Sequence, residues 1–133
     1  MIDVKRIIDK YKDSVKVRNG QDKDAVFISF PFFFPNSDES IAIKVTTADN
    51  GLPILSDCHV TCDYLEINGI EIEDYRDRLE IIMKRYGLIL DGNVFRMTVP
   101  SDDDLYLEIY LGYFVQAITL IANIGLLTDN TKD

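Results

Sequence analysis

The sequence predicts one α+β domain: a mainly antiparallel sheet of two hairpins and N-terminal strands, covered by amphipathic helices and a long apolar C-terminal helix. Three observations lead to this prediction. Residues 41–46 alternate apolar and polar side chains, which is the period of a half-buried strand. Residues 73–86 place apolar side chains at helical spacing. Residues 109–127 form a run of 19 residues without a charge, which is typical of a buried helix.

The composition favours a single domain. The chain has 133 residues, and 47% of them are hydrophobic, which is enough to bury a core without disulfides or metals. We therefore expect residues 1–133 to fold as one unit, with residues 128–133 as a frayed tail.

The N-terminal region is expected to contain a helix and two strands. Asp3 can cap a helix over residues 3–12, whose apolar side chains form one stripe. A short strand follows over residues 14–18. A second strand over residues 25–30 is expected to end at Pro31, because proline cannot donate to a β-ladder.

The middle of the chain predicts the first hairpin and a short helix. An Asp-Asn-Gly turn joins the strand over residues 41–46 to its partner over residues 52–55. A helix over residues 57–68 follows, which Asp57 can cap and Gly69 can stop.

The C-terminal half predicts two helices around a second hairpin. The amphipathic helix over residues 73–86 ends at Gly87. The hairpin joins residues 88–90 to residues 94–99. The last helix is expected over residues 105–127, after a run of aspartates that the helix dipole favours at an N-terminus.

The charge of the chain is acidic and unevenly spread. The formal net charge is −9, yet residues 1–24 carry seven Lys or Arg against five Asp. An acidic domain repels the phosphate backbone, so we do not expect direct nucleic-acid binding. A basic partner protein fits this charge, and simple solubility is the alternative. The acids that could form the binding face are Asp63, Glu66, Glu71, Glu73, Asp74, Asp77 and Glu80.

The uncharged stretch over residues 109–127 is long enough to be a transmembrane candidate. Three features argue for a soluble fold instead. Gly112, Gln116, Thr119 and Asn123 fall on one stripe of a helix. The flanks hold no Lys/Arg cluster that would set a membrane topology. The predicted strands also need a cover for their apolar face.

The last helix has more apolar surface than one sheet face can hide, so we expect part of it to meet another chain. A homodimer is one form of that contact. The aromatic run after the second strand is likewise too apolar for a free loop. The residues expected at these interfaces are Phe32, Phe33, Phe34, Tyr110, Tyr113 and Phe114.

The soft metal ligands of the chain lie in Cys58-His59-x-x-Cys62. Zinc needs four ligands, and the chain has no further Cys or His, so we expect no zinc site. A reactive Cys58 near a helix N-terminus stays open, against the alternative of a small core residue. The N-terminus shows no apolar signal segment, which predicts a cytoplasmic protein with reduced thiols.

A metal-dependent nuclease is the main enzymatic alternative. It would need carboxylates that converge on a cation beside a lysine. Asp57, Asp63 and Glu66 are close in sequence, but Ala42 stands two residues before Lys44, where a carboxylate would be expected. We therefore assign no catalytic residue, no metal ligand and no cofactor.

Several short motifs carry a resemblance to a known family: Leu55-Ser56-Asp57, Thr61-x-x-Tyr64-Leu65, Asn68-Gly69-Ile70, Tyr86-Gly87, Asp91-Gly92 and the strand Ile41-Ala42-Ile43-Lys44-Val45. In them the chain resembles the uncharacterised prokaryotic and bacteriophage family called domain of unknown function 1828, over residues 25–100. The family usually shows Asp-Gly after the first Asp, where this chain has Cys58-His59. The resemblance implies a phage or mobile-element origin and no established activity, so it transfers no catalytic residue.

Together these observations predict a non-enzymatic protein-binding module of phage or mobile-element type. Its most specific form is an acidic inhibitor of a host defence protein that binds nucleic acid. A metal-dependent nuclease or a thiol enzyme is the alternative from another class.

Overall fold

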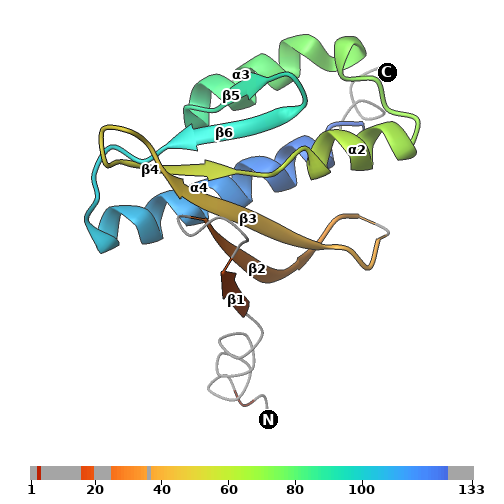
Figure 1. Ribbon diagram of the computed structural model, residues 1–133. Coiled ribbons are helices and arrows are strands. Elements are labelled where there is room, and N and C mark those ends of the chain that lie inside the picture. Colours follow the sequence, from red (N-terminus) through yellow and green to blue (C-terminus); the bar gives the residue numbers. More distant parts are fainter. Residues whose placement is uncertain (1–2, 4–15, 20–24, 36, 126–133) are drawn as a thin grey trace.

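The computed structural model describes residues 3, 16–19, 25–35 and 37–125 (Figure 1). Its strands are β1 (Lys16–Asn19), β2 (Val26–Phe33), β3 (Ser40–Thr47), β4 (Pro53–Ser56), β5 (Ile89–Asp91) and β6 (Val94–Thr98). Its helices are α2 (Val60–Ile67), the 3-10 helix η1 (Ile72–Tyr75), α3 (Arg76–Tyr86) and α4 (Asp104–Ala122). The helix expected over residues 3–12 and the tail over residues 128–133 lie outside the described residues, apart from Asp3.

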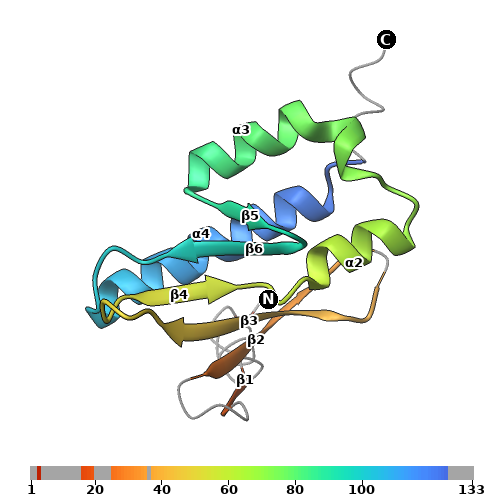
Figure 2. The same cartoon turned by 45° about the horizontal axis from the view of Figure 1, so that its top comes forward.

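The described strands form one six-stranded sheet in the order β1-β2-β3-β4-β6-β5, with every neighbouring pair antiparallel. The two predicted hairpins are β3–β4 and β5–β6. They join because β4 pairs with β6, which sets Leu55 opposite Met97. Figures 1 and 2 show α4 running along one face of this sheet. The α+β class with an antiparallel sheet is confirmed.

The strand expected to end at Pro31 continues to Phe33, so that prediction was wrong. Its pairing with β3 shifts register between Ser29 and Phe33. At such an irregularity the ladder does not need the N–H that proline lacks, and the strand can pass through the residue. β2 then regains its partner where Phe33 pairs with Ser40.

The core lies between one face of the sheet and the helices. Alternate residues of β3, β4 and β6 turn the same way, so that Ile43, Leu55 and Met97 are almost fully buried. The predicted inward residues of the second hairpin, Phe95, Met97 and Val99, are all buried. The helices add these buried side chains to the same cluster: Leu65, Leu79, Phe114, Ala117, Ile118, Ile121 and Ala122.

The helix boundaries differ from the predicted ones at three places. α2 begins at Val60 and not at Asp57, because two left-handed residues separate them. A single helix was expected over residues 73–86, but a 3-10 turn precedes α3. α4 ends at Ala122 and not at residue 127. Its predicted start is confirmed, because the Asp103 carboxylate accepts a hydrogen bond from the Leu105 N–H at 3.0 Å.

Candidate functional site

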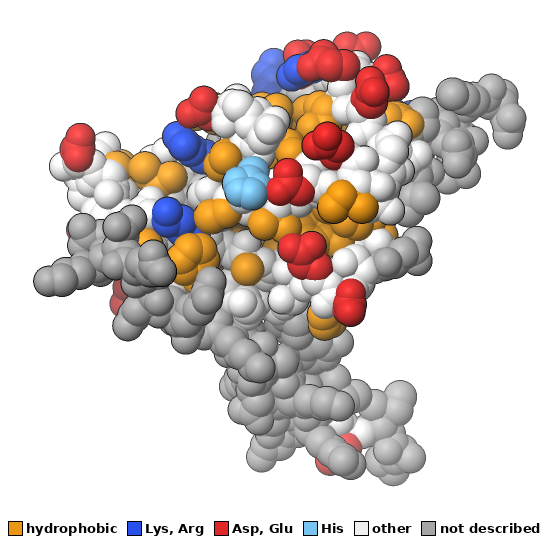
Figure 3. Space-filling model, turned by 45° about the vertical axis from the view of Figure 1, so that its right-hand side comes forward, with side chains coloured by type: hydrophobic (Ala, Val, Ile, Leu, Met, Phe, Trp, Pro, Cys, Tyr) orange, Lys and Arg blue, Asp and Glu red, His pale blue; other side chains and the backbone are white. Residues whose placement is uncertain are grey.

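The acidic surface, as we name it, comprises the seven carboxylate residues predicted to bind a partner and the exposed side chain of Ile67. The structure places the acids on α2, on η1 and α3, and on the segment between them. Six are exposed and Asp63 is half-buried. Figure 3 shows this side of the molecule, where acidic side chains are spread over the helices with hydrophobic side chains between them. The residues are Asp63, Glu66, Ile67, Glu71, Glu73, Asp74, Asp77 and Glu80.

Ile67 is the exposed apolar residue of this surface, and the sequence did not single it out. Its side chain is 84% exposed, more than that of any other large hydrophobic residue described. α2 buries Thr61, Cys62 and Leu65 on one side, and Ile67 falls off that side in the last turn. Gly69 then ends the helix with φ +73°, as predicted. A helical projection of α2 would have found this residue.

Asp63 and Glu73 of the acidic surface each lie beside a basic side chain. The Asp63 carboxylate lies 2.7 Å from Nδ1 of His59, one turn earlier. The Glu73 carboxylate pairs with the Arg76 guanidinium across the start of α3, and this contact raises the pKa of Arg76. Both pairs are exposed, so water screens them and their contribution to stability is small. The surface keeps an excess of negative charge.

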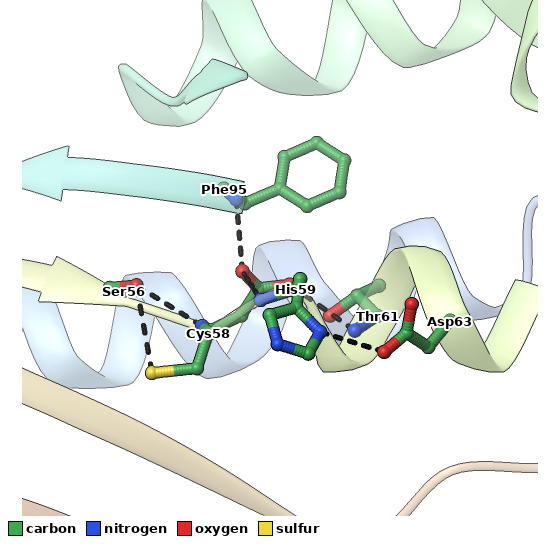
Figure 4. Close-up of polar contacts among 7 residues, drawn as sticks. Ser56, Cys58, His59, Thr61, Asp63 and Phe95 are labelled. Atoms are coloured by element: carbon green, nitrogen blue, oxygen red, sulfur yellow. Dashed lines mark hydrogen bonds and ion pairs between the residues drawn. The ribbon is translucent and has the colours of Figure 1, made fainter. Parts of the chain in front are cut away.

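The turn that leads into α2 is held by a buried carboxylate. Asp57 follows β4 and is only 3% exposed. Its carboxylate accepts three backbone hydrogen bonds: from the Phe95 N–H at 2.9 Å, from the His59 N–H at 3.2 Å and from the Thr61 N–H at 3.3 Å (Figure 4). The N-cap position of α2 belongs to His59 and not to Asp57, so the predicted position of the cap was wrong, but Asp57 still accepts the Thr61 N–H in the first turn from three residues before Val60.

Burial and hydrogen bonding act in opposite directions on Asp57. Loss of water raises the pKa of its carboxyl, and the three N–H donors lower it again by favouring the charged form. The Thr61 hydroxyl lies close enough to add to that lowering. Its geometry nevertheless falls short of a normal hydrogen bond, which leaves this buried hydroxyl without a full partner. Desolvation is the larger effect, so the pKa of Asp57 is raised.

Cys58 and His59 take a left-handed backbone conformation, with φ +55° and +63°. Residues with a Cβ adopt this region rarely, and two in succession store strain that the surroundings must hold. The Ser56 hydroxyl accepts a hydrogen bond from the Cys58 N–H at 3.1 Å, and Asp57 holds the next N–H.

The cysteines and the histidine do not form a nucleophile and base pair. The Cys58 sulfur lies 4.0 Å from the Ser56 hydroxyl, while the His59 ring turns to Asp63 (Figure 4). Cys62 is buried in the core, and desolvation raises its pKa to about 11, which keeps it a thiol. Among the described residues, no group of three or more His, Cys, Asp or Glu is placed to hold a metal ion.

The aromatic residues expected at an interface divide between core and surface. Phe34 is 3% exposed and stacks on Tyr64 with the ring centres 4.8 Å apart, and Phe114 is fully buried. The prediction was wrong for these two, because the chain covers them itself. Phe33 is exposed and Tyr113 partly so, whereas Tyr110 is half-buried. The side chain of Phe32 lies outside the described residues.

A groove of about 720 Å³ lies beside the tyrosines of α4. Tyr86 reaches across it toward Gln116, at 3.5 Å between hydroxyl and amide oxygen. Tyr110 and Tyr113 meet edge to face with their ring centres 5.5 Å apart. The lining residues are Lys84, Arg85, Tyr86, Gly87, Met97, Thr98, Pro100, Tyr110, Tyr113 and Gln116. The basic pair at the end of α3 was not singled out in the sequence.

α4 is long and apolar enough to cross a membrane by length and composition, with a mean hydropathy of 1.5 and 28% of the stretch buried in the fold. The core helix of a soluble protein passes the same test, so this property alone does not show whether the protein lies in a membrane.

No protein-family model, curated protein or solved structure matches this chain.

Proposed function

We propose that this protein is a non-enzymatic binding module that holds a basic partner protein on its acidic surface. One observation carries the proposal: Ile67 is 84% exposed in the last turn of α2, beside Glu66, and five further carboxylates follow on the segment that leads through η1 into α3. Protein interfaces commonly combine an apolar centre with a polar rim, and Ile67 with the neighbouring acids offers both kinds of side chain. The carboxylates would attract a basic partner and fix its orientation, while Ile67 would enter a pocket of that partner.

The most specific partner class is a host protein that binds nucleic acid, because such a protein already offers a basic surface of matching charge. Occupying that surface would inhibit it. The phage or mobile-element origin in this proposal rests on the resemblance over residues 25–100. We place the protein in the cytoplasm, where the free Cys58 and Cys62 would stay reduced.

The test begins with capture from a host lysate and is decided with the purified partner. Titration calorimetry compares the native chain with a variant that carries Glu66→Gln, Glu73→Gln, Asp74→Asn and Asp77→Asn. We expect on the order of tenfold weaker binding or more, and an affinity of the native chain that falls with salt. Ile67→Ser alone is expected to weaken binding by a similar factor. The affinity of this variant should still fall with salt, because its carboxylates are unchanged.

A matched control removes the same number of charges elsewhere. Asp38→Asn, Glu39→Gln, Asp49→Asn and Asp102→Asn change four exposed carboxylates outside the acidic surface. This variant is expected to bind as the native chain does. Equal losses in both variants would mean that only the net charge matters, and the acidic surface would not be the binding site.

A further inference from the structure

An exposed stripe runs along α4 on the side away from the core. Its residues are Leu105, Ile109, Gly112, Gln116 and Thr119, which follow one another at steps of four, three, four and three. All five are exposed, and Leu105 and Ile109 keep 59% and 42% of their surface in contact with water. We call this stripe the α4 seam. It differs from the acidic surface in position and in chemistry.

The spacing of the seam fits another helix. Alternating steps of three and four are the heptad pattern by which two helices pack along their length. The residues that face the core follow a separate stripe, which includes Phe114, Ile118 and Ile121. The described part of the chain therefore accounts for the core stripe of α4 and leaves the seam exposed.

Gly112 supports a close approach at the middle of the seam. Glycine weakens a helix interior because it gains conformational freedom on unfolding. A Cβ at this position would meet no atom of the described residues within 4 Å, so their packing gives no reason for a glycine here. Contact with the backbone of a second helix would supply one, because small residues let helices come close.

The charge distribution favours a second copy of the chain as the occupant. The protein has a net charge of −9, so two copies repel wherever their acidic sides meet. From Ile109 to Gly125 the chain carries no charge, and the seam offers a basic partner no carboxylate to bind. Along this uncharged stretch two acidic chains repel each other least; at the N-terminal end of the seam, where Asp102, Asp103 and Asp104 precede Leu105, they still repel, so we expect salt to strengthen the pair.

We propose that α4 pairs with α4 of a second copy, parallel and in register, about a twofold axis along the seam. In this arrangement Leu105 and Ile109 meet their own counterparts, and Gln116 and Thr119 can hydrogen-bond across the axis. An antiparallel pair would instead set the apolar half of the seam against its polar half.

The edges of the seam also agree with a parallel pair. Glu108 flanks the seam on one side, and Tyr113 flanks it on the other, five residues later. In a parallel pair such positions face each other between the two copies. Tyr113 lines the groove that also holds Lys84 and Arg85, so the Glu108 carboxylate of one copy would approach a basic edge of the other.

The first experiment measures the mass of the full chain by analytical ultracentrifugation over a hundredfold range of concentration. We expect a reversible dimer whose dissociation constant rises at least tenfold with Ile109→Lys. Ile81→Lys is the matched control, because Ile81 is an isoleucine of α3 with 62% exposure, and it is expected to leave the constant unchanged. A native chain that stays monomeric at every concentration overturns the proposal, as does a dimer that Ile109→Lys leaves intact.

The second experiment tests the parallel register. In a chain that also carries Cys58→Ser, Thr119→Cys is expected to form an intermolecular disulfide on mild oxidation, because the two positions face each other across the axis. Tyr106→Cys, which lies off the seam, is the control and is expected to crosslink slowly. Equal crosslinking at both positions, or none at position 119, would contradict the parallel pair. Binding of a monomeric chain to lipid vesicles through α4 would assign the seam to a membrane instead.

Discussion

Asp57 and Phe95 are joined in both directions: the Asp57 N–H donates to the Phe95 carbonyl at 3.2 Å, and the Asp57 carboxylate accepts from the Phe95 N–H at 2.9 Å. The pair ties the end of β4 to β6, just before the chain turns into α2. It therefore connects the two hairpins and the start of a helix through one side chain. The Leu55-Ser56-Asp57 motif has a structural function at this point.

Asp57→Ala is expected to lower the free energy of unfolding by about 3 kcal/mol, because three backbone N–H groups lose their acceptor and at least two of them are buried. Asp57→Asn keeps an oxygen that can accept from Phe95 and His59, so we expect about half that loss. Urea unfolding followed by circular dichroism measures both. Asp49→Asn, at an exposed turn, serves as the control. If Asp49→Asn lowered the free energy of unfolding as much as Asp57→Ala does, the loss could not be assigned to the three hydrogen bonds of Asp57.

The stability of the native chain is expected to depend on pH through Asp57. Its pKa in the folded chain is raised above 3.8 by burial, so the folded chain holds this proton at pH values where the unfolded chain has lost it. The contribution of Asp57 to the free energy of unfolding therefore falls as the pH rises from 3.8 through the pKa of Asp57 in the folded chain. Acidification from pH 7 is expected to stabilise the native chain relative to Asp57→Asn. A relative loss on acidification would show that the N–H donors outweigh desolvation.

The two cysteines are expected to react at different rates. A thiol with a pKa of about 11 is ionised to roughly 0.1% at pH 8, and Cys62 is also buried. Cys58 is half-buried and is expected to be alkylated first. Iodoacetamide labelling with peptide mass spectrometry distinguishes them, with the urea-unfolded chain as the reference for full labelling. Equal rates in the folded chain would contradict the burial of Cys62.

Gly112→Ala separates the stability of the helix from the contact along the seam. In a chain kept monomeric by Ile109→Lys, the added methyl group meets open space, so we expect the free energy of unfolding to rise by about 0.5–1 kcal/mol. Thermal and urea unfolding measure this change. Gly87→Ala is the comparison: its φ of +69° strains a residue with a Cβ, and we expect a loss of stability there. If Gly112→Ala also lowered the free energy of unfolding of the monomeric chain, the glycine would be required by the fold of a single chain and not by contact with a second copy.

The sequence alone predicted the type and order of most elements, because these depend on local patterns. The alternation over residues 41–46 and the helical spacing up to Gly87 are properties of neighbouring residues. The seven acids were also expected to be accessible, since the carboxylates of an acidic chain rarely become fully buried. The pairing of β4 with β6 could not be predicted in this way, because it joins residues that are far apart along the chain.

Only the tertiary structure decided which side chains the fold covers. Phe34 and Phe114 are as apolar as Phe33, yet the first two lie in the core and the third is exposed, because their elements turn them in different directions. The same holds for Ile67, whose exposure depends on which side of α2 meets the sheet. Composition and periodicity thus determined an acidic α+β domain with an apolar final helix. The burial of individual residues could not be predicted from local patterns, because it depends on how elements that are distant in sequence pack against each other.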